Sequence, residues 1–479
     1  MSYGRKKIRT DAQVISMVNV VEEVNKACAV HRENQIDTQR LWDYYCGKTA
    51  ILGKKKEVRP EINHKINENR CFEVVGFHKG YVFGEPIQYV RRENSTSEVD
   101  DNAIASDINA LNGYMADASK AACDAALAEW LYVCGTSYRL GLPNREWSPD
   151  GDEPPFNIYA LDPRSTFVVY SNAIDERPVM SVTITERDLG VKEYFVYTEN
   201  SSFRYKDMGP ITEEPHALGM IPIIEYPADN ARLGVYEIAL PLMDALNELQ
   251  SNRMDDLVQY VNSFLAVFGA SLDEETYKKL NDWKTLCMPE GTDAKYLSAV
   301  MSQSDVQTLK DDLYQSILTI CGVPNRNGGS STSDTGTAVI YRDGYATADA
   351  RARATELVFK ASEKNFLRLI LRILRDTVGT RLRLTDIDAH FTRRNYENIT
   401  AKSQVLISML NNANIHPELA FAYSGMFVDP ESAYLQSMAW KEEQQKKEAE
   451  RIAGFGAGTM PGVQQKAGGL EGASANQVQ

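Results

Sequence analysis

The sequence predicts an α+β protein that is mostly helical, and three observations lead to this expectation. Helical periodicity runs from about residue 338 to 378, two shorter amphipathic helices flank a small insert before it, and short strands alternate with turns between 137 and 226. A chain of 479 residues is too long for one ordinary core and predicts roughly two to four domains. Hydrophobic and charged contents of 43% and 25% are typical of a folded globular protein.

Charge and cysteine usage narrow the class of protein. The net charge of −14 argues against a protein that coats nucleic acid, but not against one that DNA slides past. The first 60 residues are net positive, and the remainder carries the acidic excess. The seven cysteines contain no C-x-x-C pair, which predicts a reduced, intracellular protein without structural zinc. No run of 18 apolar residues occurs and no apolar segment follows the basic start, so we expect neither a membrane partner nor a secretory signal.

The first third of the chain predicts helices followed by a strand. Residues 12–35 are weakly helical, and residues 41–52 are expected to form an aromatic-anchored turn. Gly47-Lys48-Thr49 matches the end of a phosphate-binding loop, but Trp42 stands where that motif needs glycine, so a P-loop is excluded. A further helix is expected to end in the glycine-containing stretch 80–86, with a strand up to residue 90.

The next region predicts a helix and then a run of antiparallel strands. An alanine-rich helix over 102–134 is expected to end at Gly135, which suits a left-handed C-cap. The expected strands lie at 137–142, 157–160, 166–171, 179–186, 191–198, 202–206 and 221–226.

The basic run Lys54-Lys55-Lys56, with Arg59 close behind, has two interpretations. It is either a solvated surface or a contact with an acidic partner.

Two amphipathic helices are expected on either side of a compact insert. The first covers 236–265 with Pro241 in its first turn, and the second follows Ser304 and ends at Gly322. In the insert, Ser271 and Glu274 form a capping box for a helix to about Trp283, and strands are expected at 285–288 and 294–298.

A small, polar loop follows the second helix. Its residues are Asn325, Arg326, Asn327, Gly328, Gly329, Ser330, Ser331, Thr332, Ser333, Asp334, Thr335 and Gly336. Taken alone, this composition is most simply a linker. Its position between helices with apolar stripes favours a functional loop instead.

The helix from about 338 to 378 is unusually long, at about 40 residues or about 60 Å. Its apolar positions hold no strict heptad, so packing between neighbouring subunits is favoured over a coiled coil. Its basic residues are expected to pair with acids of an adjacent subunit or to reach nucleic acid; they are Arg351, Arg353, Lys360, Lys364, Arg368, Arg372 and Arg375. Short strands at 381–384 and 387–391, helices within 399–450 and a disordered tail from Ile452 complete the chain.

No catalytic, cofactor or metal site is predicted. The usual hydrolase, metalloprotease, dinucleotide and calcium motifs do not occur. No two of the six histidines have helical spacing, and Asp311-Asp312 diverge on a helix, so no enzyme is expected. We expect surface or packing roles for the histidines, which are His31, His64, His78, His216, His390 and His416.

The order of several short motifs resembles the portal proteins of tailed bacteriophages, most closely the siphophage type. The motifs are Leu41-Trp42-x-Tyr44-Tyr45-x-Gly47, Asn63-His64-Lys65-Ile66, Gly80-Tyr81-x-x-Gly84-x-Pro86-Ile87, Gly135-Thr136-Ser137-Tyr138, Leu161-Asp162-Pro163, Ile221-Pro222-Ile223-Ile224-Glu225 and Gly322-Val323-Pro324. The resemblance covers about residues 38–440 and includes the plan of helix, insert, helix, loop and long helix.

The resemblance implies a portal fold with named regions in a ring oligomer. The implied regions are a basic N-terminal segment 1–37, a wing 38–235, stem helices 236–265 and 305–324, a clip 266–304, a tunnel loop 325–337, a tunnel and wing helix 338–380, distal wing strands and crown helices 381–451, and a disordered tail 452–479. The implied docking surface of the clip consists of Glu274, Lys278, Lys279, Trp283, Glu290, Asp293 and Lys295.

The resemblance also implies a structural role in the virion. A ring, usually of twelve copies, would stand at one capsid vertex and conduct double-stranded DNA during packaging and ejection. Its partners would be terminase, a head-completion adaptor, and the major capsid and scaffolding proteins, with assembly in the host cytoplasm. One alternative is another virion connector. The other is an enzymatic subunit of the packaging motor, although the missing P-loop argues against it.

Overall fold

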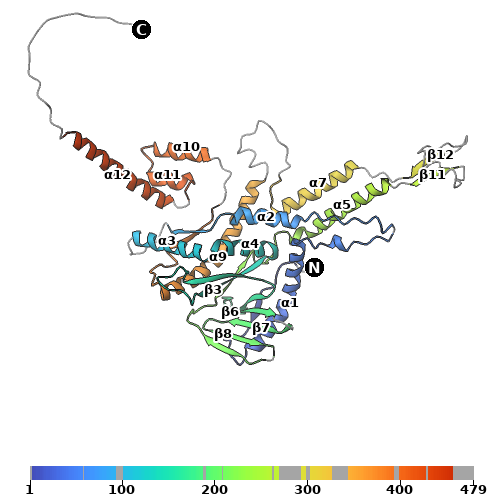
Figure 1. The fold of residues 1–479 in the computed structure, drawn as a ribbon, viewed down its shortest axis with the longest axis horizontal. Coiled ribbons are helices and arrows are strands. Elements are labelled where there is room, and N and C mark those ends of the chain that lie inside the picture. Colours follow the sequence, from blue (N-terminus) through green and yellow to red (C-terminus); the bar gives the residue numbers. More distant parts are fainter. Residues whose placement is uncertain are drawn as a thin grey trace, which may run out of the picture. The chain divides into compact units, whose positions relative to one another are not determined.

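The computed structural model describes residues 3–57, 59–92, 101–186, 190–207, 209–261, 264–268, 293–297, 303–325, 344–392, 399–427 and 430–456 (Figure 1). The chain forms two compact units, Met1–Tyr396 and Glu397–Gln479. The first unit mixes helices and sheets, whereas the described elements of the second are all helical. This agrees with the predicted α+β, mostly helical fold class.

The helices of the first unit include one that is much longer than a typical globular helix. The helices are α1 (Val20–Tyr45), α2 (Arg70–Phe83), α3 (Asp101–Asp117), α4 (Lys120–Cys134), α5 (Leu240–Val261), α7 (Gln303–Cys321) and α9 (Tyr345–Thr377), with the 3₁₀ turns η1 (Ala50–Gly53) and η3 (Glu237–Ala239). At 33 residues, α9 is about 50 Å long. No helix in the described ranges is long and apolar enough to cross a membrane.

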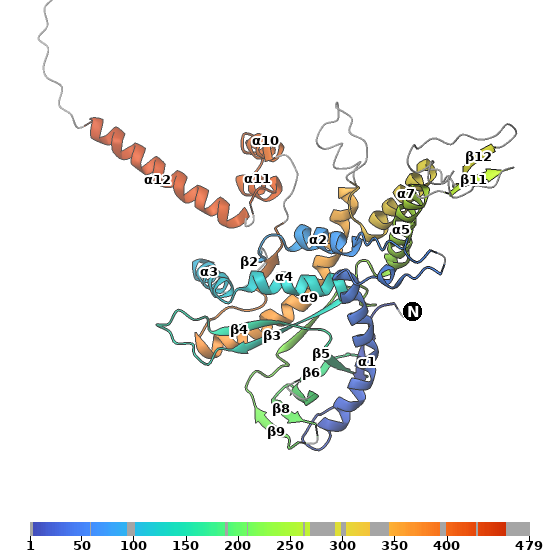
Figure 2. The same ribbon diagram turned by 45° about the vertical axis from the view of Figure 1, so that its right-hand side comes forward.

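The largest sheet has six strands in the order β1-β5-β6-β7-β8-β9. Their bounds are β1 Ile8–Thr10, β5 Thr166–Ser171, β6 Pro178–Glu186, β7 Lys192–Tyr197, β8 Ser201–Lys206 and β9 Thr212–Pro215. The β5–β9 strands form an antiparallel meander, and β1 adds to its edge in parallel, with Ile8 opposite Val169. Helix α1 lies along this sheet (Figure 2).

Three smaller sheets complete the first unit. A three-stranded antiparallel sheet has the order β10-β3-β4, and two pairs are β13-β2 and β11-β12. The bounds are β2 Gln88–Arg91, β3 Thr136–Pro143, β4 Phe156–Leu161, β10 Ile223–Pro227, β11 Phe264–Phe268, β12 Asp293–Leu297 and β13 Ile387–His390.

The apolar interior divides into three clusters of buried side chains. One surrounds α9 from Phe359 onward, where Phe359, Phe366 and Ile370 pack with α3, α4 and the β10-β3-β4 sheet. A second joins α2 and α4 to the base of the α5/α7 pair, and the third fills the space between α1 and the six-stranded sheet. Helix α9 and the α5/α7 pair are therefore anchored in different cores of one unit.

Two backbone positions explain where α3 and α4 begin and end. Ser119 has φ +54° and separates α3 from α4, so the single helix predicted over 102–134 is two helices. Gly135 ends α4 with φ +74°, as predicted, and an added Cβ would lie 2.2 Å from the carbonyl oxygen of Arg232. Only glycine fits that left-handed, closely packed turn.

Several other predicted boundaries are wrong. Helix α1 continues through the expected turn at 41–52 as far as Tyr45, and the expected strand at 381–384 is irregular. Helix α5 ends at Val261, because the apolar residues Phe264–Phe268 pair as strand β11. Apolar periodicity alone cannot separate a helix end from such a short strand.

The predicted long helix is shorter at its N-terminal end. Gly344 adopts φ +85° and precedes α9, so the helix begins at Tyr345, and residues 338–343 lie outside the described ranges. The remaining predicted strands match β2–β8, β10 and β13, whereas β1 and β9 were not predicted. Strand β1 has only three residues, and all four residues of β9 are exposed, so neither strand shows the alternation of apolar and polar residues that marks a strand.

The second unit contains α10 (Ile399–Leu410), α11 (Pro417–Ser424) and α12 (Pro430–Gly456). Pro417 lies in the first turn of α11, as its fixed φ favours. Helix α12 reaches Gly456, so the tail predicted to be disordered from Ile452 begins with helix; residues 457–479 lie outside the described ranges.

Candidate functional site

The predicted tunnel loop is carried on a narrow base. Of its residues only Asn325 belongs to the described ranges; residues 326–343 lie outside them. The two ends of that segment meet, because a Cβ added to Gly344 would lie 3.8 Å from the Cα of Pro324. The chain therefore leaves the end of α7 and returns to the start of α9 at one point (Figure 1).

The end of α7 is a Schellman-type turn. Gly322 has φ +72°, and the backbone N–H of Val323 donates to the Leu318 carbonyl at 2.9 Å. An added Cβ at Gly322 would lie 2.4 Å from the Cδ of Arg351, which leaves no room for another residue. The helix thus ends at the glycine that the sequence marked.

Side chains from two other helices satisfy the last carbonyls of α7. Arg351 of α9 donates through Nη1 to the Ile320 carbonyl at 2.7 Å, and His78 of α2 donates through Nε2 to the Cys321 carbonyl at 2.8 Å. Burial lowers the pKa of His78 to about 4, and the hydrogen bond to Cys321 only partly offsets this effect. His78 is therefore a neutral donor near pH 7, and the loop base joins α2, α7 and α9.

The helix pair α5/α7 is buried at its base and exposed along its outer faces. Leu246 and Ile317 are fully buried there. Farther along, Arg253 donates to Gln303 and Gln307, both at 3.0 Å, and ties the helices by polar contacts. Several apolar residues of the pair that were predicted as buried stripes are exposed instead, namely Ile238, Leu257, Leu309 and Ile320.

The basic run of the sequence packs on this helix pair. Asp255 of α5 is fully buried and pairs with Lys54 at 3.2 Å, Lys56 at 2.7 Å and His64 at 2.8 Å. Burial alone would raise the pKa of Asp255, but the hydrogen bonds from His64, Lys56 and Lys54 outweigh it and lower the pKa. The acidic contact of Lys54 and Lys56 is therefore within the chain.

A buried ionic cluster fixes α9 in the first unit. Glu363 of α9 pairs with Arg139 of β3 and with Lys120 of α4, each at 3.0 Å. The hydroxyls of Tyr89 and Tyr226 also donate to Glu363, at 2.6 and 2.8 Å. Asp124, which is another buried acid, balances the second positive charge through Lys120 and Arg139. Burial alone would raise the pKa of Glu363, but Arg139 and Lys120 outweigh it and lower the pKa.

Most basic residues of α9 have partners within the same chain. Lys360 pairs with Asp388 at 3.6 Å, and Arg372 donates to the Leu218 carbonyl at 2.7 Å. The other contacts of this kind are Arg351 with Ile320, Arg353 with Asp349, Arg368 with Asn365, and Arg375 with Leu382. Partners on another subunit or on nucleic acid are not needed to explain these residues.

The predicted clip lies at the far end of α5/α7, where β11 and β12 form an antiparallel pair (Figures 1 and 2). Asp293 and Lys295 belong to β12, opposite Phe268 and Ala266. The other residues predicted for its docking surface lie outside the described ranges, namely Glu274, Lys278, Lys279, Trp283 and Glu290. The same applies to the predicted capping box and the strand at 285–288.

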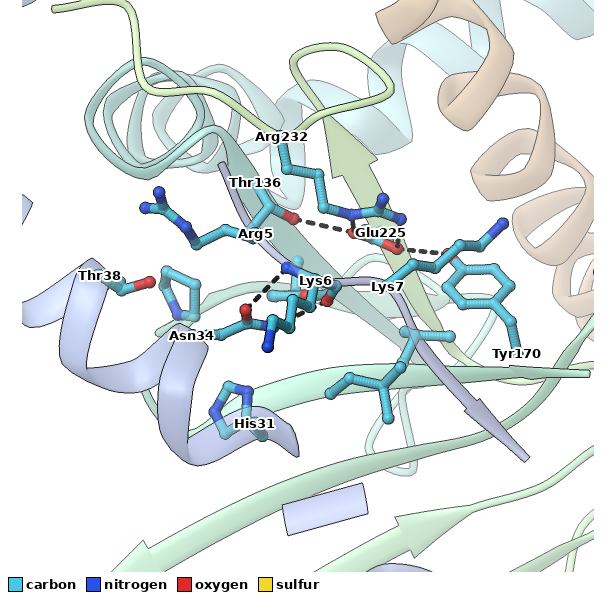
Figure 3. A pocket seen from close by; sticks show the side chains of 14 residues that line it. Arg5, Lys6, Lys7, His31, Asn34, Thr38, Thr136, Tyr170, Glu225 and Arg232 are labelled. Carbon is cyan, nitrogen blue, oxygen red and sulfur yellow. Dashed lines mark hydrogen bonds and ion pairs between the residues drawn. The ribbon is translucent and has the colours of Figure 1, made fainter. Parts of the chain in front are cut away.

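Figure 3 shows a polar cavity where the N-terminal segment crosses α1 and the sheets. Its volume of about 10 Å³ is close to that of one water, so it does not hold an organic ligand. Two of its lining residues, Glu225 and Arg232, form an ion pair at 2.6 Å, so these polar groups already have partners within the chain. Among the described residues, no group of three His, Cys, Asp or Glu side chains is arranged to hold a metal ion.

These features define a chain built around a helix pair, a loop base and an anchored long helix. A family model described as "Phage portal protein, SPP1 Gp6-like" matches residues 26–452. The chain therefore belongs to this family of phage portal proteins, as the motif order predicted.

The solved structures that are similar to the chain include two of gene transfer agent particles. One is the neck of an empty gene transfer agent (GTA) particle computed with C6 symmetry, with 12% identity, 82% of this chain and 94% of that chain covered, and a TM-score of 0.46. The other is the virion of a native gene transfer agent particle, with 13% identity, the same coverage of both chains and a TM-score of 0.45. No curated protein matches the chain.

The sequence contains no sign of the side chains that hold the end of α7 to its neighbours. His78 and Arg351 come from helices far apart in the sequence, and neither lies in a motif that indicates helix capping. A long-range contact of this kind leaves no local pattern in a single sequence.

Proposed function

We propose that this portal protein assembles into a ring, usually of twelve copies, at one vertex of the capsid. Double-stranded DNA passes through the ring during packaging and ejection, guided by the loop that includes Asn325 and residues 326–336. The observation that carries the proposal is the loop base, where Pro324 and Gly344 meet at the junction of the helix pair and α9. The described ends of this segment are thus held by two helices that both pack in the first unit.

Exposed apolar residues support contacts between copies of the chain. Leu357 on α9 has 72% of its surface exposed, and Leu257 on α5 and Leu309 on α7 are about half exposed. Exposed alanines lie on the same side of α9 as Leu357, at 350 and 361. Surfaces of this kind are buried in subunit interfaces, and a second copy is the partner that a ring supplies.

The dimensions suit a conduit. Twelve helices of about 10 Å diameter placed side by side form a ring of about 38 Å between axes and a bore of about 28 Å. This bore is wider than a B-DNA duplex, and small polar loops are suited to fill the remaining space. The loop carries only Arg326 and Asp334 as charged residues, so it does not bind many phosphates and allows DNA to slide.

The β11-β12 end of the helix pair is the proposed clip, which meets terminase and later the head-completion adaptor. The contact surface includes Asp293 and Lys295 on β12 together with residues 274–290. Helices α10–α12 are the proposed crown and face the capsid interior, where major capsid and scaffolding proteins assemble around the ring. We place the protein in the virion, assembled in the host cytoplasm, and assign it no enzymatic activity of its own.

Deletion of residues 328–334 tests the role of the loop. The deleted protein should still form particles of about 0.6 MDa, the mass of twelve copies of a 53.7 kDa chain, while DNA packaging falls strongly. Mass photometry measures the particle, and nuclease-protected DNA measures packaging. A control deletion of 466–472, of equal length in the tail, should affect neither.

Each part of the proposal has its own contrary result. Undiminished packaging by the loop deletion would overturn the role of the loop. Wild-type protein that remains monomeric under all assembly conditions would overturn the ring.

A further inference from the structure

The N-terminal segment, residues 3–10, is a structural element outside the matched family region, which begins at residue 26. Its end is strand β1, which adds in parallel to the edge of β5. Ile8 is buried in the core of the six-stranded sheet. Figure 3 shows this segment running between α1 and the sheet strands.

The start of the segment is seated on the loop before η3. Gly4 has φ +80°, and an added Cβ would lie 2.2 Å from the Ala231 carbonyl oxygen, so only glycine fits. The backbone N–H of Arg5 donates to that same carbonyl at 3.0 Å. On the other side, Lys6 and Asn34 of α1 exchange two hydrogen bonds, both at 2.8 Å.

The segment is also fastened to the beginning of the helix pair. Glu237 belongs to η3, directly before α5, and is fully buried. Its carboxylate accepts hydrogen bonds from the backbone N–H of Gly4 at 3.1 Å and of Gly234 at 3.0 Å, and it pairs with the Arg5 guanidinium. The segment therefore connects the six-stranded sheet and α1 with the base of α5.

Its attachments are mostly polar and ionic, which favours opening short of global unfolding. Ile8 is the one apolar side chain of residues 3–10 that is buried. Arg5 is buried as well, yet its Nε and Nη1 have no hydrogen-bond partner among the described residues, so its desolvation offsets part of the gain from Glu237. At the outer end, Lys7 and Arg9 pair with Glu176 at the surface, where salt weakens the attraction.

We propose that residues 3–10 are a releasable clasp that fixes η3, directly before α5, to the six-stranded sheet. When the clasp is seated, the helix pair is held on the sheet through Glu237. When it opens, the base of α5 and residues 229–239 become mobile while the core around α9 stays closed.

Hydrogen exchange of the full-length protein, followed by mass spectrometry, tests the clasp. Gly4→Ala should unseat it without removing a side chain, and Glu237→Gln should weaken its fastening. In both variants, amides of residues 229–239 should exchange at least about tenfold faster than in the wild type, with unchanged exchange in α9. Gly53→Ala is the matched control, because an added Cβ there meets nothing within 4 Å.

Two results would overturn the proposal. Unchanged exchange at 229–239 in both variants would show that the segment does not hold the base of α5. Equally faster exchange in α9 would show that residues 3–10 are part of the global fold rather than a clasp that opens by itself.

Discussion

His78 and Arg351 show how single side chains hold the base of the proposed loop. The last carbonyls of a helix have no partner within it, and a buried carbonyl without one costs about 1–3 kcal/mol. Here the Ile320 and Cys321 carbonyls receive donors from α9 and α2. The loop base is therefore held by contacts between elements.

His78 gives the protein a predicted dependence on pH. Its pKa is about 4 in the fold and about 6.5 in an unfolded chain, so the unfolded chain takes up a proton first on acidification. The stability from neutral His78 is present above pH 6.5 and is lost as the pH falls toward 4. Between pH 7 and 5 this loss is about 2 kcal/mol of unfolding free energy.

Comparison with His78→Gln isolates this effect, because glutamine can donate a hydrogen bond but does not titrate. Urea unfolding at pH 7 and pH 5 should show a larger loss for the wild type, by about 2 kcal/mol. Equal losses in the two proteins would mean that His78 is not a buried neutral donor.

For single residues, the sequence predicted where glycines end helices better than it predicted which side chains pair with each other. Gly135 and Gly322 were expected to end helices, since a left-handed C-cap favours glycine whatever surrounds it. For Lys54 and Lys56, the sequence left both a solvated surface and an acidic partner open. Only the fold places Asp255, some 200 positions along the chain, beside them.

Among the elements, α9 is held most firmly from Phe359 onward. Phe359, Phe366 and Ile370 are buried there, and Glu363 joins the helix to α4 and β3. The stretch before Phe359 buries only small side chains, Ala348 and Ala352. Helix α9 is therefore anchored in the core along its later turns and joined to the loop base near its start.

Glu363→Ala tests the anchor. It leaves Arg139 and Lys120 buried with Asp124 as their remaining acid, so the free energy of unfolding should fall by about 3–5 kcal/mol. Arg353→Ala removes an exposed ion pair on the same helix and should change it by less than about 0.5 kcal/mol. Urea denaturation measures both, and Glu363→Gln serves if the alanine variant does not fold. If Glu363→Ala lowered the free energy of unfolding no more than Arg353→Ala does, Glu363 would not anchor α9.

Helices and strands with a long periodic pattern of apolar residues were predicted, whereas short elements were often missed. The helices α5 and α7 and the strands β3–β8 were found because apolar residues recur at a constant period over several turns or residues. The break at Ser119 was missed because alanine-rich sequence on both sides favours helix. Strand β1 was missed because its three residues are too few to show a period.

For the whole molecule, the sequence predicted the family, but not which surfaces remain exposed. The sequence predicts buried apolar stripes on α5 and α7, yet part of each stripe is exposed in the single chain. A sequence pattern marks residues that avoid water without saying whether the same chain or another copy covers them. The proposed ring would cover these exposed residues with a second copy of the chain.

Leu357→Asp therefore tests the interface between copies. A leucine buried at a subunit contact contributes about 1.5–3 kcal/mol, and a carboxylate there adds a desolvation cost at every interface of the ring. Because Leu357 is 72% exposed in the single chain, the variant should fold normally but fail to form the 0.6 MDa particle. Circular dichroism checks the fold and mass photometry the assembly.

Ile174→Asp is the matched control, since Ile174 is fully exposed in a turn of the β5–β6 connection. The same change of charge there should leave assembly intact, because a β-connection residue lies on neither α9 nor the α5/α7 pair. If Leu357→Asp formed particles as readily as Ile174→Asp, then α9 would not contact a neighbouring subunit at Leu357. The ring would then have to close through the exposed face of α5/α7, where Leu257 and Leu309 are the residues to change next.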